Sequence, residues 1–208
     1  MLFSLANLGV ALALLAWIAV GTLLVRRAER DLSANKLPPP WPALALAVAL
    51  AVLAFVLRPV PQAALCAVAC TMLVIAAGAD QRTGYIFDVL TLPATLVVLV
   101  IAVATQTTTM AAWGVALLVG IFGSVVALTR GRTLGLGDVK AMYALGAAFG
   151  PLESLIAIFV AAVSGIVVAT VAGRLRRGSE LSFGPHLAVG ATFALVAGAP
   201  LAHRLMGV

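Results

Sequence analysis

Apolar residues fill most of this chain in long blocks that short polar stretches interrupt. The first block, residues 1–25, contains no charged residue. Seven more uncharged blocks follow, bounded by Pro, Gly, Thr or charged residues, at about 43–57, 62–79, 89–104, 110–129, 141–150, 154–173 and 186–202. A helix needs about 20 mostly apolar residues to cross a bilayer. The pattern therefore predicts an all-α polytopic transmembrane bundle of about eight segments, with six or seven possible because the second and sixth blocks are short.

The composition agrees with a membrane protein and excludes a soluble domain. Hydrophobic residues make up 63% of the chain and charged residues only 10%, whereas soluble domains are about half apolar and a quarter charged. We therefore predict a single membrane-embedded domain over residues 1–208. Cys66 and Cys70 lie four residues apart in one apolar block, a spacing that predicts helix packing. Two cysteines are too few for a disulfide framework or a tetrahedral zinc site.

Basic residues predict the orientation, because they favour cytoplasmic loops. With the N-terminus and the C-terminus placed outside, only Arg58 and Arg204 fall on the outer side. The inner side receives Arg26, Arg27, Arg30, Lys36, Arg82, Arg130, Arg132, Lys140, Arg174, Arg176 and Arg177. Residues 26–42 then form a cytoplasmic connector, basic at first and proline-rich at its end. Because the basic residues mark short loops rather than an aromatic-interleaved face, we expect no nucleic-acid partner.

Two of the seven acidic residues are candidates for chemistry. Asp80 directly follows the third block and Asp138 opens the sixth, so both are expected at the cytoplasmic end of their helices. Taken singly, Asp80 fits a helix end paired with Arg82, and Asp138 fits an acid favoured by the helix dipole. Taken together, two acids on one side of a bundle suit water activation by a carboxyl pair. Four others are expected to be solvated, namely Glu29, Asp31, Glu153 and Glu180.

The residues around Asp138 and before the last block add detail. Gly135 and Gly137 permit close approach of another chain beside the carboxylate. Lys140 is either a marker of the cytoplasmic side or a charge that favours an ionised carboxylate nearby. Pro185 suits the first position of a helix, and His186 is interpreted as structural, with a proton carrier or a pore residue as alternatives.

Three motifs in this order resemble the type IV prepilin peptidases, membrane aspartic proteases of the G-x-G-D kind. The first runs from Asp80 through Asp88, Leu90, Thr91 and Leu92 to Pro93; the second comprises Gly135, Gly137, Asp138 and Lys140; the third comprises Phe183, Gly184, Pro185, Leu187, Ala188 and Gly190. The resemblance implies that Asp80 and Asp138 are catalytic. It further implies supporting or substrate-binding roles for Gly135, Gly137, Lys140, Asp88, Phe183, Gly184 and Pro185.

By the same resemblance, the chain removes the leader of type IV prepilin-like precursors for a pilus or type II secretion system. The implied location is the bacterial cytoplasmic membrane, with the active site facing the cytoplasm and with no metal or cofactor. Two departures from the motifs are Phe87 and Ser182, which stand where the family usually has proline. Residues 26–42 carry no cysteine, although bifunctional members have a paired C-x-x-C domain there for methylation. N-methylation and zinc are therefore not expected.

Two other functions stay open at this point. A small proton- or cation-coupled transporter or channel would line its path with Asp80, Asp138 and His186, although no inverted repeat supports this. A non-catalytic scaffold of pilus assembly is the other, and the presence of both aspartates argues against it. The sequence gives no oligomeric state.

Overall fold

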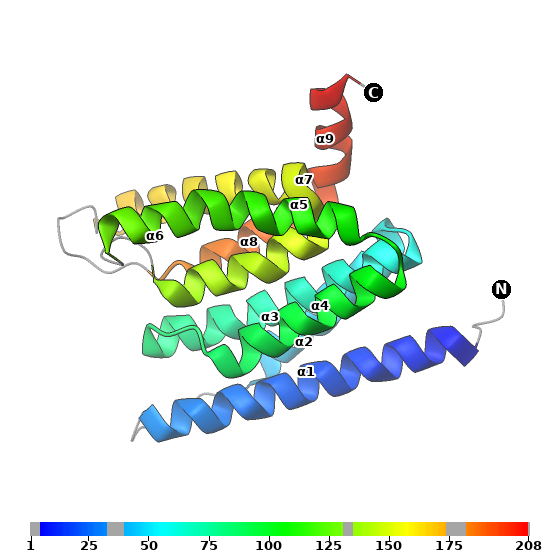
Figure 1. Ribbon diagram of the computed structural model, residues 1–208. Helices are drawn as coiled ribbons and strands as arrows, with labels where there is room; N and C mark the ends of the chain where they lie inside the picture. Colours follow the sequence, from blue (N-terminus) through cyan, green and yellow to red (C-terminus); the bar gives the residue numbers. More distant parts are fainter. Residues whose placement is uncertain (1–4, 33–39, 131–134, 174–181, 208) are drawn as a thin grey trace.

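The computed structural model describes residues 5–32, 40–130, 135–173 and 182–207, and every regular element in these ranges is helical. The elements in chain order are α1 (Leu5–Leu32), α2 (Trp41–Leu57), α3 (Val60–Thr83), α4 (Asp88–Ala104), α5 (Thr108–Leu118), the π-helical η1 (Val119–Gly123), α6 (Ser124–Thr129), α7 (Leu136–Val171), α8 (Gly184–Phe193), the π-helical η2 (Ala194–Gly198) and α9 (Ala199–Met206) (Figure 1). The predicted all-α bundle is confirmed.

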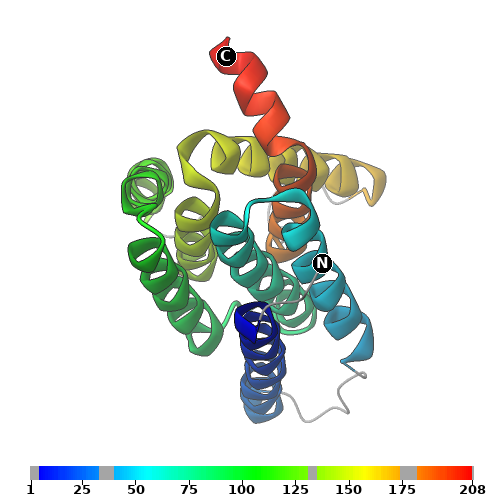
Figure 2. The ribbon, with the colours of Figure 1, turned by 90° about the vertical axis from the view of Figure 1, so that its right-hand side faces the viewer.

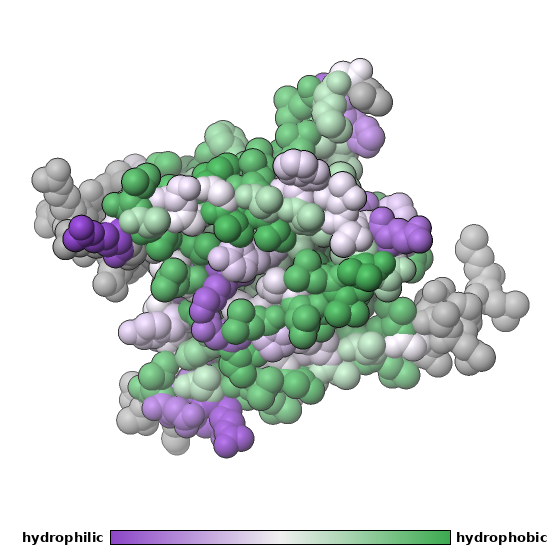
Figure 3. All heavy atoms as spheres, in the orientation of Figure 1, coloured by the Kyte–Doolittle hydropathy of each residue, from purple (hydrophilic) through white to green (hydrophobic). Residues whose placement is uncertain are grey.

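Five helical stretches within the described residues are long and apolar enough to cross a membrane. They are Gly9–Leu32, Val60–Thr83, Thr108–Thr129, Leu136–Val171 and Gly184–Met206. The helices α2 and α4 are apolar but shorter. Hydrophobic residues cover most of the face shown in Figure 3, as a surface in contact with lipid requires. The chain is thus a multi-pass membrane protein, and the number of full spans stays a prediction.

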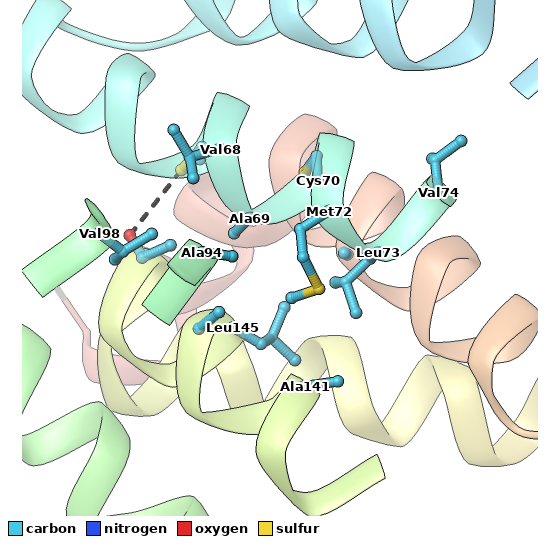
Figure 4. Packing of buried hydrophobic residues seen from close by; sticks show 14 of the residues in the cluster. Val68, Ala69, Cys70, Met72, Leu73, Val74, Ala94, Val98, Ala141 and Leu145 are labelled. Atoms are coloured by element: carbon cyan, nitrogen blue, oxygen red, sulfur yellow. Dashed lines mark hydrogen bonds between the residues drawn. The ribbon is translucent and has the colours of Figure 1, made fainter. Parts of the chain in front are cut away.

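Helix α3 forms the centre of the bundle. Every residue from Leu65 to Ala77 is buried, and α1, α2, α4, α7 and α8 all pack against this helix (Figure 2). A helix that is apolar on all sides is expected in such a position. Figure 4 shows Met72 of α3 in the packed layer that also contains Leu145 of α7. Cys66 and Cys70 are buried free thiols in this core, consistent with the predicted packing role.

Helix α7 bends sharply at Gly150, where the backbone has φ +71° and ψ −177°. Only glycine adopts this region readily, and the following Pro151 has no N–H to continue the helical ladder. The two halves of α7 consequently run in different directions (Figure 2). The predicted break between the sixth and seventh apolar blocks lies close to this bend.

The first half of α7 contacts α5 backbone to backbone. A Cβ added at Gly114 would lie 2.0 Å from the carbonyl oxygen of Gly146, and one added at Gly146 would lie 2.6 Å from the carbonyl oxygen of Gly114. Small residues allow such close packing between membrane helices. This contact fixes the helix that carries Asp138 against its neighbour.

One end of the bundle gathers the ends of α1, α3 and α6 and the beginnings of α4, α7 and α8, at the left of Figure 1. Among the basic residues predicted to be cytoplasmic, those at these helix ends are Arg26, Arg27, Arg30, Arg82, Arg130 and Lys140. The others, Lys36, Arg132, Arg174, Arg176 and Arg177, lie outside the described residues. Arg58, predicted to be external, follows α2, whose end lies at the opposite side of the bundle. Which end faces the cytoplasm stays a prediction.

The expectation that Glu29 is solvated is wrong. Helix α1 extends to Leu32, seven residues beyond the predicted first block, so Glu29 lies in the helix rather than in an aqueous connector. Its side chain is fully buried, and its Oε1 accepts a hydrogen bond from Arg82 Nε at 3.0 Å. A buried carboxylate requires such a partner. Arg82 therefore pairs with Glu29 rather than with Asp80. Residues 33–39 of the predicted connector lie outside the described residues, and so does Glu180.

The same expectation is wrong for Glu153. Its side chain is 12% exposed, and both of its carboxylate oxygens accept hydrogen bonds from Arg58, at 3.0 and 2.7 Å. Arg58 Nη2 also donates to the carbonyl oxygen of Ala194 at 2.8 Å, where the π-helical η2 begins. Burial alone would lower the pKa of Arg58, but the hydrogen bonds and charge of Glu153 outweigh burial, and the pKa is raised.

Candidate functional site

Asp80 lies in the last turn of α3 and is 5% exposed. The backbone N–H of Gly184 donates to its Oδ2 at 2.8 Å, and the Ser182 hydroxyl donates to its main-chain oxygen at 3.2 Å. That oxygen also accepts the N–H of Gly84, which ends α3 in the left-handed conformation with φ +71°. The third sequence motif therefore holds Asp80 from across the bundle.

Gly184 is needed at this contact because no larger residue fits. A Cβ placed there would lie 2.9 Å from Asp80 Oδ2 and 3.0 Å from Asp80 Cβ. Pro185 follows within the first turn of α8, where a missing N–H costs nothing. Phe183 packs against the core just before the helix. Of the predicted supporting residues of the third motif, Gly184 contacts Asp80, and Phe183 and Pro185 flank it in the chain.

Asp138 is half-buried in the first turn of α7, three residues after the N-cap residue Gly135. The Gly135 backbone hydrogen-bonds the carboxylate, as an acid at this helix position can do. A Cβ at Gly135 would lie 3.3 Å from Asp138 Oδ2. Gly137 contacts a different segment, since its Cβ would lie 3.0 Å from the carbonyl oxygen of Ile86. The two glycines therefore permit two separate close approaches.

The structure brings Asp80 and Asp138 together. The end of α3 and the beginning of α7 lie at the same end of the bundle (Figure 1), near enough for the charge of Asp80 to act on Asp138. Two carboxyls in mutual contact disfavour double ionisation. This arrangement agrees with the common location that the sequence predicts for the two acids, while their action as a catalytic pair stays a prediction.

Asp88 and Lys140 form an ion pair between the beginnings of α4 and α7. Lys140 Nζ donates to Asp88 Oδ2 at 2.6 Å, with side-chain exposures of 31% for Lys140 and 53% for Asp88. Exposed pairs of this kind contribute less than about 1 kcal/mol. Lys140 therefore has its own carboxylate partner, and the pair connects the first and second sequence motifs at the edge of the site.

His186 is buried near the site, which was not predicted. It is 7% exposed, its Nδ1 lies 3.0 Å from Ser164 Oγ, and it interacts electrostatically with Asp80. The structural role favoured from the sequence omits this interaction. The sequence places His186 two residues after Gly184. This spacing would have indicated that His186 lies near Asp80 only if the contact between Gly184 and Asp80 had been known.

A cavity and the distribution of possible metal ligands were compared with the positions of Asp80 and Asp138. A cavity of about 830 Å³ lies between α1, α2, α3 and α8, and its lining includes Gln81 and Arg82 but neither Asp80 nor Asp138. Within the described ranges, no cluster of three or more His, Cys, Asp or Glu residues is arranged to hold a metal ion.

Comparison with known proteins identifies the family. Residues 66–170, which include both Asp80 and Asp138, match the type IV leader peptidase family. Two curated proteins of Burkholderia pseudomallei, from strains 1026b and K96243, are each called prepilin leader peptidase/N-methyltransferase and are 31% identical over 156 residues. The alignments cover 66% of this chain and 47% of each relative, so the chain spans about half the length of these proteins. No solved structure matches the chain. Because the family match extends over half of its residues, the chain belongs to the type IV leader peptidase family.

Proposed function

We propose that this chain is an aspartic prepilin leader peptidase, which hydrolyses the leader of type IV pilin-like precursors at the cytoplasmic face of the bacterial inner membrane. The observation that carries the proposal is the location of Asp80 and Asp138 at the same end of a membrane bundle, where the charge of Asp80 acts on Asp138. Family membership supports a peptide bond as the target, and the names of the two relatives support a prepilin as the substrate.

Hydrolysis by this pair needs one carboxylate and one protonated carboxyl. We take Asp80 as the base, with the N–H of Gly184 on its Oδ2 stabilising the ionised form, and the chemistry is the same if the two aspartates exchange roles. Asp80 takes a proton from water as the water oxygen bonds to the scissile carbon, while Asp138 gives its proton to the carbonyl oxygen. When the tetrahedral intermediate collapses, the C–N bond breaks and the amine leaves with the proton from Asp80. Asp138 then recovers its own proton from the hydroxyl of the new carboxyl group.

The position of the pair suits a substrate with a charged leader ahead of a hydrophobic helix. Such a precursor places its scissile bond at the membrane boundary, because the helix stays in hydrocarbon and the charged leader stays in water. Asp80 ends a long apolar helix and Asp138 begins another. This arrangement supports cleavage at the border of the bilayer.

The test is co-expression of the chain with a prepilin, followed by mass spectrometry of the prepilin. Wild type should remove the leader, whereas Asp80→Asn and Asp138→Asn should not, and Asp31→Asn at an exposed position serves as control. Normal processing by both site variants would show that the carboxyl pair is not catalytic. The same mass reports any methyl group on the new N-terminus, which we do not expect. Aspartate-dependent ion flux in liposomes without processing would favour a transporter instead.

A further inference from the structure

We propose that the cavity of about 830 Å³ between α1, α2, α3 and α8 is a binding site for an anionic phospholipid. Arg26 and Arg82 would hold the phosphate group, and the acyl chains would fill the apolar interior. Because neither Asp80 nor Asp138 lines this cavity, the inference does not depend on the proposed peptidase function.

The lining of the cavity changes from basic to apolar along the helix axes. Arg26 near the end of α1 and Arg82 near the end of α3 lie at the end of the bundle where α8 begins (Figure 1). The wall formed by α8 and η2 continues from Pro185 to Val196, about 16 Å along the helix axis. The interior is lined by apolar side chains, which include Leu46, Val74, Ile75, Phe193 and Val196. A phospholipid has the same arrangement, with a charged headgroup at the interface and its chains in hydrocarbon.

The two threonines of the lining do not make the interior polar. The Thr22 hydroxyl donates to the carbonyl oxygen of Ile18, and the Thr192 hydroxyl donates to that of Ala188, both at 2.8 Å and within their own helices. Both hydroxyl hydrogens are therefore used inside the protein. Acyl chains suit such a wall, because they need no hydrogen-bond partner there.

Glu29 holds the Arg82 guanidinium at the edge of the cavity and leaves part of it available. Arg82 Nε and Nη2 both donate to Glu29 Oε1, the Nε bond at 3.0 Å. Arg82 Nη1 lies over Gly78, another lining residue, since a Cβ added at Gly78 would be 3.2 Å from this nitrogen. Among the described residues Nη1 has no acceptor, and 33% of the Arg82 side chain is exposed. The guanidinium is thus fixed in position with two N–H groups left for a phosphate oxygen.

An anionic phospholipid fits both the charge and the walls of the cavity. Arg26 keeps the local charge positive after Glu29 has neutralised Arg82, and basic pockets between transmembrane helices bind anionic headgroups. Val189 and Val196 line the cavity and are half-exposed, so the cavity opens toward the surrounding hydrocarbon and a lipid can enter from the side. The hydrophobic helix of a prepilin would also suit the walls, but it carries no phosphate for the arginines.

The test is a titration of the purified full chain in detergent, with bound lipid counted by native mass spectrometry. Dioleoylphosphatidylglycerol should bind at least about tenfold more tightly than dioleoylphosphatidylcholine, which has the same chains and no net charge. The double variant Glu29→Gln with Arg82→Gln removes the guanidinium without leaving a buried carboxylate unpaired, and should weaken binding of the anionic lipid about tenfold. Val189→Trp narrows the cavity and should weaken it as well. The matched controls Arg204→Gln and Val103→Trp, at exposed positions outside the lining, should bind as wild type does.

Three results would overturn the inference. Equal affinity for the two lipids would show that the arginines do not hold a phosphate. A preference for the anionic lipid that survives in the double variant and in Val189→Trp would place the lipid elsewhere on the chain. Displacement of the lipid by a prepilin, with cross-linking of the prepilin to the α8 wall, would show that the cavity holds the substrate helix.

A measurement on wild type keeps the test valid if the variants fail to fold. Phosphatidylglycerol with a photoreactive group on one acyl chain should label α3, α8 or η2 at the lining residues. Labelling confined to other helices would overturn the inference. None of these readouts depends on leader removal, so they separate the lipid site from the proposed peptidase function.

Discussion

The contact between Gly184 and Asp80 gives the sharpest prediction about the site. Replacing Gly184 with Ala adds a methyl group 2.9 Å from Asp80 Oδ2, whereas ordinary contact begins at 3.4 Å. The carboxyl must therefore retreat by about 0.5 Å, and its hydrogen bond of 2.8 Å to the Gly184 N–H must lengthen. Gly184 has no positive φ, so alanine itself fits the helical backbone. The perturbation is confined to the position of Asp80.

The expected loss follows from the size of this displacement. A misplacement of about 1 Å in an active site costs up to about a hundredfold in rate, so half of it costs about tenfold, or about 1.4 kcal/mol of transition-state stabilisation. We expect Gly184→Ala to remove the leader from a prepilin about tenfold more slowly than wild type. The free energy of unfolding should fall by about 1–3 kcal/mol at most, which is the usual cost of one extra methyl group in a packed site.

The assay is the rate of leader removal by purified chain in detergent, with thermal unfolding measured on the same sample. The matched control is Gly9→Ala, because a Cβ at Gly9 meets no atom within 4 Å. The control should process the prepilin at the rate of wild type. A folded Gly184→Ala variant with the rate of wild type would refute the argument that this close approach sets the position of Asp80.

Three further predictions concern stability and accessibility. Arg58→Met leaves the Glu153 carboxylate buried without its partner and should lower unfolding stability in detergent by about 3–5 kcal/mol, while Arg58→Met combined with Glu153→Leu should regain most of it. Cys66 and Cys70 are buried, so a maleimide should label them only after unfolding, and rapid labelling of folded chain would contradict their placement. Gly150→Ala imposes a side chain on a glycine-only conformation and should cost about 1–3 kcal/mol, visible as a lower melting temperature.

The helical architecture could be predicted because it depends on local apolar length. Long blocks without charge must become helices in a bilayer. The Gly150–Pro151 pair predicts a break in the helix from its own residue types, whatever packs around it. The common location of Asp80 and Asp138 also followed from counting segments between them. Their electrostatic contact could not be derived in this way, because it depends on how α3 and α7 pack.

The buried ion pairs were missed for a related reason. Glu29 lies among arginines in sequence, yet Arg82, which donates a hydrogen bond to it, is 53 residues away, and Arg58 and Glu153 are 95 residues apart. A local charge pattern predicts a solvated face, while burial depends on a partner that only the folded chain supplies. The burial of His186 was missed for the same reason, because it depends on the packing of α8 against α3 and α7.

The glycine contact between α5 and α7 has a mechanical consequence for the acid at the membrane border. Gly146 follows Asp138 by eight residues, a distance of about 12 Å along the helix axis. Because the two backbones touch at Gly114 and Gly146, this contact determines the direction of the helical segment that leads from Gly146 back to Asp138. A methyl group added at either glycine would push the two helices apart and displace Asp138, so the position of this carboxyl depends partly on buried residues more than two helical turns away.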